Sequence, residues 1–370
     1  MDGTVLRGLV LHRDGWSEGT VVVENGRITH CSDKIENGES GGKLFEGMII
    51  PGFMDMHTHI GDSGARGDLP VSLEETVLPG GVKHRFLRGS TREVLISSLK
   101  ASIEEVHPGV TFLLDYREGG LEGLQLLEEA VGPEGPMVAP LSRVVPGDDP
   151  ENVLGRSMGF GIPSLNDAEI ELRELAGSQD KLFSLHASES FREDMDRILE
   201  LRADQVVHMV AGSGDDWVSL AGENIPVTVC PRSNSAYNIP VPLGSMLESG
   251  LRLTLGTDNS LSSMQDIFRE METAWLLLRK TGVRGSEASR EVFGMAVGEP
   301  LQGTSLIEKL PPWRMWWDKD WPRKGDPSHL FVARRPGNDL WKRDPFTFIV
   351  RFLDRSQVLH TCSPAPQYLF

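Results

Sequence analysis

The stretch that decides the fold runs from residue 51 to residue 59 and reads Pro51-Gly52-Phe53-Met54-Asp55-Met56-His57-Thr58-His59. It predicts a strand that ends in two histidines. Residues i and i+2 of a strand lie on one face, so the imidazoles of His57 and His59 point the same way. Two neutral imidazoles at this spacing can hold one divalent ion. Alone the pair is a weak signal, because His-x-His also occurs by chance in 370 residues.

Outward from this stretch, apolar and β-branched runs alternate with helical patterns. The runs are 49–57, 110–116, 137–145, 158–162, 182–186, 205–210, 226–230 and 251–256. They number eight, as a closed parallel barrel requires. A doubly wound nucleotide-binding sheet would have a glycine-rich turn after its first strand, where this chain has His-Thr-His. We therefore expect an α/β fold, a (β/α)₈ TIM barrel.

Helical patterns support this alternation. Residues 91–106 place Leu95, Leu99 and Ile103 four residues apart on one face. Residues 191–201 and 264–279 show the same pattern. Strands that alternate with helices, without internal repeats, are typical of α/β barrels.

The two ends of the chain have a different pattern. Residues 4–45 indicate short strands, with a hairpin at Glu24-Asn25-Gly26. After residue 303 a tryptophan-rich stretch, 313–321, precedes strand-like runs at 330–333, 346–352 and 357–360. We predict three parts: 49–315 as the barrel, and 1–48 with 316–370 as the two halves of a small β-sandwich module. The role of the tryptophan-rich stretch stays open.

Composition excludes several classes of partner. The net charge of −17, from 54 acidic and 37 basic residues, argues against nucleic acid and anionic membranes. No apolar stretch reaches the ~18 residues that a membrane span needs. The start lacks the pattern of a signal peptide. Cys31, Cys230 and Cys362 are odd in number and far apart, which favours a reduced cytoplasmic protein. A small-molecule substrate is expected, and a homodimer remains open.

Chemistry-bearing residues gather where the later strands end. His186 closes the fifth run and Glu189 follows three residues later. His208 lies in the sixth run, and Asp258 follows the eighth. Barrel enzymes assemble their sites at the carboxyl ends of the strands. Because the chain has only ten histidines, this concentration is hard to explain as core filling.

The ordered set resembles the amidohydrolase superfamily, in its mononuclear branch with cytosine deaminase, adenosylhomocysteine deaminase and the chlorotriazine hydrolases. The similarity spans almost the whole chain. The motifs that carry it are Pro-Gly-Phe-x-Asp-x-His-x-His at 51–59, Pro-x-Ser-Asn at 231–234, Gly-Thr-Asp at 256–258 and Lys-Gly-Asp-Pro-Ser-His-Leu at 324–330.

The resemblance implies a ligand set and roles. The residues that would hold one divalent ion are His57, His59, His186 and Asp258. Zinc is favoured and iron is the alternative. Glu189 would transfer protons, His208 would polarise the water or the substrate, and Asp258 could also orient the water. The fourth run, 158–162, lacks the lysine that bridges two ions in binuclear relatives.

Substrate contacts are expected from residues near the other strand ends. Arg117 follows the second strand, Arg143 lies in the third, and Asn234 ends the motif after the seventh. An arginine there could bind a carboxylate or phosphate, although ion pairing with neighbouring acids is an equal alternative.

The leading hypothesis is hydrolytic deamination of a heterocyclic amine such as a nucleobase, nucleoside or pterin. The second is ring opening of a cyclic amide, as in imidazolonepropionase. Ammonia is released only in the first. A third hypothesis is a non-catalytic relative, which should have lost a ligand or Glu189. This chain keeps all six candidate residues.

Overall fold

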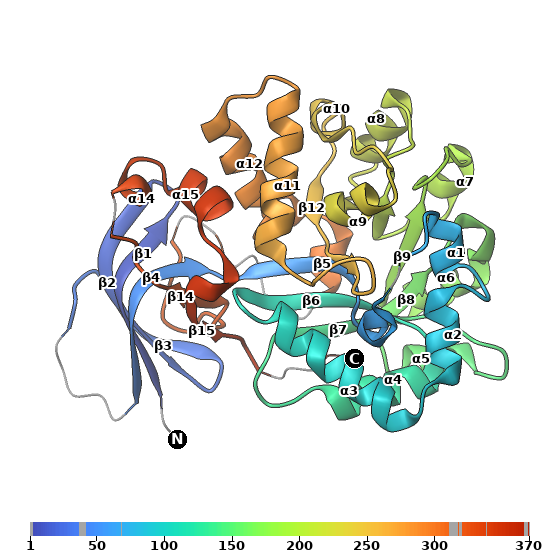
Figure 1. Ribbon diagram of the computed structural model, residues 1–370, viewed down its shortest axis with the longest axis horizontal. Helices are drawn as coiled ribbons and strands as arrows, with labels where there is room; N and C mark the ends of the chain where they lie inside the picture. The colour runs from blue at the N-terminus through green and yellow to red at the C-terminus, as the bar shows by residue number, and fades with distance from the viewer. Residues whose placement is uncertain are drawn as a thin grey trace.

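The computed structural model describes residues 3–36, 42–67, 69–310, 317, 320–337, 339–365 and 369. Two β-sheets lie side by side, and a long continuous stretch of chain runs from one into the other (Figure 1). Of the tryptophan-rich stretch, Trp313 and Trp316 lie outside the described residues, whereas Trp317 and Trp321 are buried and pack against each other.

The larger sheet is parallel and curled. Its strands are β5 (Phe53–His59), β6 (Val110–Arg117), β7 (Met137–Ser142), β8 (Gly159–Ile162), β9 (Leu182–Ala187), β10 (Gln205–His208), β11 (Val227–Val229), β12 (Leu253–Leu255) and β13 (Asp258–Asn259). They follow one another in sequence order from β5 to β12, and β13 pairs with β5 on its other edge. Each predicted run overlaps one of the strands β5 to β12, although the first run also includes the end of β4 from the other sheet.

Two residues join the edges of this sheet. β12 pairs with β11, and β13 pairs with β5 after only Gly256 and Thr257. The backbone of Gly256 passes so close to His57 that an added Cβ would lie 2.7 Å from the His57 Cβ. The chain therefore brings Asp258 next to the end of β5.

Most helices lie around the curled sheet, whereas the last two, α14 and α15, lie beside the smaller sheet (Figure 1). The helices are α1 (Leu73–Val77), α2 (Val82–Gly89), α3 (Arg92–Val106), α4 (Gly120–Ala130), α5 (Pro150–Leu154), α6 (Ile170–Ser178), α7 (Met195–Glu200), α8 (Gly214–Gly222), α9 (Pro231–Ala236), α10 (Leu243–Glu248), α11 (Ile267–Lys280), α12 (Gly285–Ala296), α13 (Ser305–Lys309), α14 (Leu340–Arg343) and α15 (Pro345–Phe352). The predicted helices at 91–106 and 264–279 are confirmed as α3 and α11. The one predicted at 191–201 is shorter, because Asp194 caps it by accepting hydrogen bonds from the backbone N–H groups of Asp196 and Arg197.

The smaller sheet joins the two ends of the chain. Its strands are β1 (Thr4–His12), β2 (Gly15–Glu24), β3 (Arg27–Ser32), β4 (Lys43–Pro51), β14 (Leu330–Ala333) and β15 (Val358–Cys362), in the order β15-β14-β4-β1-β2-β3. The predicted β2–β3 hairpin is confirmed, with Asn25 and Gly26 in the left-handed region at φ 52° and 71°. The expected β-sandwich is not confirmed, because the described strands form one sheet.

One predicted strand is wrong. Residues 346–352 belong to helix α15, although their aromatic and β-branched residues favour a strand. Asp344 caps the helix by accepting a hydrogen bond from the Thr347 N–H, and Pro345 occupies its first turn. The helix buries Phe348 and Ile349 and packs against α11 and α12. Local capping and tertiary packing therefore outweigh strand propensity here.

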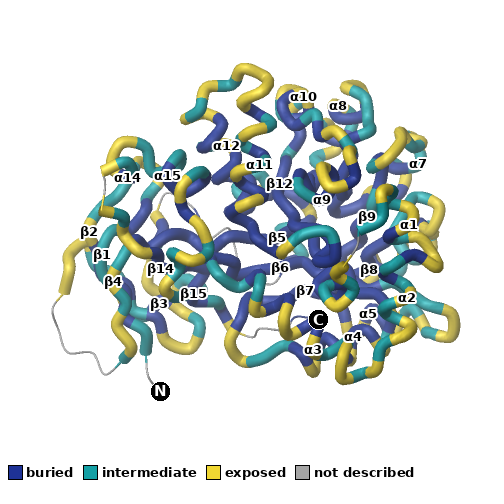
Figure 2. The backbone as a smooth tube through the Cα atoms, viewed as in Figure 1, coloured by how far each residue is buried: buried dark blue, intermediate teal, exposed yellow. Residues whose placement is uncertain are grey.

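Burial points to the position of the site. All seven residues of β5 are buried, and the centre of the curled sheet is the most buried part of Figure 2. Four of these buried residues are polar: Asp55, His57, Thr58 and His59. Buried polar groups need partners, so this strand must face a polar interior.

No helix of the described residues has the length and apolar character of a membrane span.

Candidate active site

Five of the predicted residues converge at the carboxyl ends of the parallel strands. Their side chains form two overlapping groups, and within each group one nitrogen or oxygen atom per residue lies within 4.8 Å of the others. The first group is His57, His59 and His186, and the second is His57, His208 and Asp258. The His57 ring, which is fully buried, belongs to both.

The contacts within this histidine–aspartate cluster are close. The Nε2 atom of His57 lies 3.2 Å from both His186 Nε2 and Asp258 Oδ1. The Nε2 atom of His59 lies 3.7 Å from the same oxygen of Asp258. Ser233 donates its hydroxyl hydrogen to the other oxygen, Oδ2. Asp258 therefore keeps Oδ1 directed at the imidazoles.

The other nitrogens of two rings have acceptors, which sets their tautomers. His186 donates from Nδ1 to the backbone oxygen of Ile162 at 2.8 Å. His59 donates from Nδ1 to Glu118 Oε1, also at 2.8 Å. Each ring then presents an unprotonated Nε2 to the cluster, as a ligand to a metal must. Nitrogen and carboxylate donors without thiolate suit zinc or non-haem iron.

Electrostatics favour the same protonation state. Burial lowers the pKa of His57, His186 and His208, so these rings are neutral. Burial alone would raise the pKa of Asp258, but the hydrogen bond from His57 and the neighbouring histidines hold it well below its usual range. Neutral imidazoles with an ionised carboxylate are the protonation states in which these groups bind metal.

The backbone at the strand ends adopts an uncommon conformation. Ser188, His208 and Asp258 have φ values of 48°, 73° and 59°, in the left-handed region that disfavours residues with a Cβ. Such conformations cost about 1–3 kcal/mol each and cluster at functional sites. Here they turn His208 and Asp258 toward the cluster.

Glu189 lies beside the cluster rather than in it. Its Oε2 is 3.5 Å from His208 Nε2, and its Oε1 accepts a hydrogen bond from Asn234 Nδ2 at 2.9 Å. Burial and then the negative charge of Asp258 raise the pKa of Glu189 well above its usual range, although the Asn234 bond opposes this. A carboxyl group that keeps its proton toward neutral pH is suited to give and take protons.

A cavity of about 240 Å³ opens over these residues. Its floor includes His59, His186, Glu189, His208 and Asp258, and residues from α1 through α2 line it as well. A small heterocycle in this cavity would contact both the cluster and Glu189.

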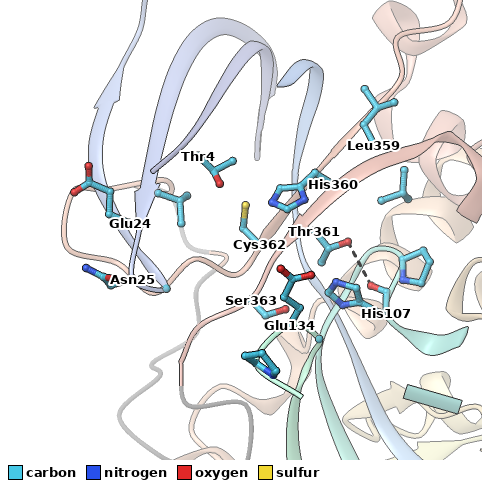
Figure 3. A pocket seen from close by; sticks show the side chains of 16 residues that line it. Thr4, Glu24, Asn25, His107, Glu134, Leu359, His360, Thr361, Cys362 and Ser363 are labelled. Carbon is cyan, nitrogen blue, oxygen red and sulfur yellow. Dashed lines mark hydrogen bonds between the residues drawn. The ribbon is translucent and has the colours of Figure 1, made fainter. Parts of the chain in front are cut away.

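A larger cavity, of about 480 Å³, lies elsewhere, between β15 and the loops before β6 and β7. His107, Glu134 and His360 line it, as Figure 3 shows. None of the predicted site residues line this cavity. Size therefore does not identify the site, whereas the convergence of predicted residues does.

Comparison with known proteins gives the family. No family model matches the chain. A protein of Methanothermobacter thermautotrophicus, provisionally named an aminohydrolase, is 31% identical over 351 residues, which cover 83% of this chain and 88% of the relative. The chain belongs to the amidohydrolase superfamily.

Other members of the superfamily are more distant. The 5'-deoxyadenosine deaminase of M. thermautotrophicus is 26% identical, over 91% of this chain and 86% of its own. Among solved structures, atrazine chlorohydrolase of Arthrobacter aurescens, in complex with zinc, superposes with a TM-score of 0.74 at 14% identity. That alignment covers 98% of this amidohydrolase and 96% of the other chain, so the two share their fold.

The three expected substrate contacts of this amidohydrolase differ in position. Arg143 lines the cavity, and its side chain is 26% exposed. Arg117 does not line it: the guanidinium is 3% exposed and forms ion pairs with Asp115 and Glu118. Asn234 is buried and contacts Glu189 instead of the cavity. Of the three, only Arg143 is in a position to touch a substrate directly.

Sequence reasoning missed a second group of residues beside the first. Asp62, Lys83 and Glu118 are buried next to His59. Glu118 offered a signal, since it follows Arg117 at the end of β6. Asp62 had a weaker one, three residues after His59. Lys83 had none, because a single lysine in a short polar helix ordinarily lies on the surface.

Proposed function

We propose that this amidohydrolase removes ammonia by hydrolysis from a heterocyclic amine, such as a nucleobase, nucleoside or pterin. The observation that carries the proposal is the position of Glu189, which lines the cavity within 3.5 Å of His208 and beside the histidine–aspartate cluster. The names of relatives support it, since one is a 5'-deoxyadenosine deaminase. The natural substrate is thus a small molecule.

We propose one divalent ion per chain, with zinc favoured over iron, held by His57, His59, His186 and Asp258. The converging donor atoms and the zinc in the solved atrazine chlorohydrolase support this. β8 and its flanks, residues 158–162, contain no lysine that could bridge a second ion. A bound divalent ion supplies Lewis acidity, which makes hydroxide available from water near neutral pH.

The chain's own groups would perform the proton transfers. Glu189 would take a proton from the attacking water and deliver it to the departing nitrogen, since its carboxyl lines the cavity beside the histidine–aspartate cluster. His208, within 3.5 Å of Glu189, polarises the water or the carbon that is attacked. Asp258 orients the water while it binds the ion. Asn234 holds Oε1 of Glu189 through its amide N–H.

We further propose a substrate contact and an architecture. Arg143 would contact an anionic or carbonyl-bearing part of the substrate, while Arg117 supports the site through Glu118. Residues 49–315 would form a closed (β/α)₈ barrel, since β12 and β13 pair with opposite edges of the curled sheet. Residues 1–48 and 316–370 would form the module of the smaller sheet.

Metal analysis combined with an ammonia-release screen tests the function. Zinc-reconstituted protein should contain one ion per chain and release ammonia from at least one purine, pyrimidine or pterin amine. Ring opening of a cyclic amide without ammonia would show the alternative hydrolase. A protein that retains no ion after reconstitution would contradict the proposed chemistry altogether.

A further inference from the structure

A second group of ligand-type atoms lies next to the histidine–aspartate cluster and shares His59 with it. His59, Asp62 and Glu118 each offer one atom within 4.8 Å of the others, and all three are buried. We call this group the carboxylate cluster. Its ligand-type atoms are as closely spaced as those of the histidine–aspartate cluster. The spacing of the atoms therefore does not distinguish which cluster binds a metal ion.

Lys83 distinguishes the two clusters. From α2 its ammonium Nζ lies 3.0 Å from Asp62 Oδ2 and pairs with Glu118 Oε1. It also approaches His59 Nδ1 at 3.1 Å. The side chain of Lys83 is only 5% exposed. A positive charge therefore occupies the position from which an ion would contact all three members.

The tautomer of His59 directs the hydrogens of Lys83 to the carboxylates. When His59 donates from Nδ1 to Glu118, that nitrogen has no lone pair for the Lys83 ammonium. The ammonium hydrogens then face Asp62 and Glu118. Protonated Nδ1 leaves Nε2 of His59 free for the first cluster, so the two clusters require the same form of the ring.

Asp62 depends on Lys83 most strongly. The carboxylate is fully buried, and no described group donates a well-aligned hydrogen bond to either oxygen. Glu118, in contrast, also contacts Arg117 Nη2 at 2.9 Å and Arg143 Nη2 at 3.5 Å. A buried carboxylate without a nearby cation is strongly disfavoured, so Asp62 requires either this ammonium or another cation in its place.

We propose that the Lys83 ammonium is the built-in cation of the carboxylate cluster, and that it excludes a second divalent ion from it. Without the ammonium, two carboxylates with added waters form an oxygen-rich site of the kind that Mn²⁺ or Mg²⁺ accepts. Lys83 thereby makes the cluster a support for His59 instead of a metal site. The inference rests on the proposed function in one respect: it assumes that the first divalent ion binds at the histidine–aspartate cluster.

A Mn²⁺ titration of the zinc-loaded protein tests this, with free Mn²⁺ measured by electron paramagnetic resonance. Lys83→Met should bind one additional Mn²⁺ per chain, at least about tenfold more tightly than wild type, since a positive charge 3.0 Å from a ligand oxygen has been removed. Lys83→Arg keeps a cation and should bind none. Lys83→Gln provides a second neutral variant if the methionine variant folds poorly.

Lys309→Met is the matched control. Lys309 is also a partly buried lysine in an ion pair, 2.9 Å from Asp204 Oδ2, and it lies near the amino ends of β9 and β10. Its loss should leave Mn²⁺ binding unchanged. Asp62→Asn combined with Lys83→Met should abolish the additional Mn²⁺, which assigns it to the carboxylate cluster.

The results separate this inference from the proposed function, because it concerns the difference between variant and wild type. Folded Lys83→Met or Lys83→Gln protein that binds no additional Mn²⁺ would overturn it. So would a second Mn²⁺ bound by wild type with equal affinity. Wild-type protein that retains no zinc after reconstitution and releases no ammonia from any tested amine would instead contradict the proposed function.

Discussion

The histidine–aspartate cluster and the carboxylate cluster meet at one residue, His59, and yet differ in whether a cationic side chain lies against their carboxylates. The first offers neutral imidazoles and one ionised carboxylate, and no lysine or arginine among the described residues forms an ion pair with Asp258. The second offers two carboxylates that are already paired with Lys83 and Arg117. We infer from this difference that converging donor atoms suit a metal ion only where no cationic side chain of the protein already pairs with them.

The two clusters also depend on different parts of the chain. The first is built almost wholly from strand ends of the curled sheet. The second adds the turn after β5 and helix α2 to the end of β6. Strand ends in a parallel sheet meet at one edge by geometry, whereas α2 reaches its position only through the packing of a connecting segment.

The largest effect on catalysis should come from substitution of Glu189, which lies beside the histidine–aspartate cluster. This substitution distinguishes loss of proton transfer from loss of metal binding. Glu189→Gln should retain the ion but lose about 10²–10⁴-fold in kcat, the range for a positioned acid–base group. Because burial and Asp258 raise its pKa, wild-type activity should fall as pH decreases through a value above that of an ordinary glutamate. The Gln variant should lack this acid limb.

His57→Asn provides the contrast, because a ligand variant should lose the ion itself. Elemental analysis and pH–rate profiles of the two variants check both statements. If Glu189→Gln stays active with its ion bound, another group must accept the proton, and His208 would be the next to test.

Arg117 and Arg143 are expected to have different roles. Arg117 should stabilise the buried carboxylates of the site, whereas Arg143 should contact the substrate. Arg117→Met removes the buried cation of Asp115 and leaves Lys83 as the remaining buried cation of Glu118, so it should cost about 3–5 kcal/mol of unfolding free energy. Its guanidinium also lies where a Cβ on Gly61 would be. Arg143→Met, at the cavity, should cost less than about 1 kcal/mol and raise KM. Urea unfolding measures the loss of stability in each variant, and steady-state kinetics measures KM. Equal losses of stability in the two variants would contradict the different roles of the two arginines.

An effect smaller than those at Glu189 and Arg117 is expected at Glu118, where the two clusters are coupled. Glu118→Gln keeps the shape but removes the ionised acceptor of the His59 Nδ1–H, so zinc affinity should fall by about 10–100-fold. Competition with a chelator measures the affinity. Glu128→Gln, which breaks an exposed ion pair with Arg156, is the control and should change nothing. Unchanged zinc affinity in Glu118→Gln would show that the clusters are independent.

Much of the site could be predicted because strand periodicity encodes side-chain direction. His57 and His59 share a face two residues apart, and His186, His208 and Asp258 follow from the same rule at other strand ends. Arg117 could be placed near the site but not assigned a role, because its neighbours Asp115 and Glu118 compete with any substrate for its guanidinium. Helix α15 was missed, since a cap at Asp344 outweighed residue propensity.

By itself, the sequence determined the alternation of strands and helices along the chain and the residues at the carboxyl ends of the strands. Those properties depend on local periodicity, which each segment carries alone. Only the tertiary structure decided that Asp62, Lys83 and Glu118 meet behind His59, and that Arg143 rather than Arg117 lines the cavity. These outcomes depend on distances between distant segments and on burial, which determines whether opposite charges must pair.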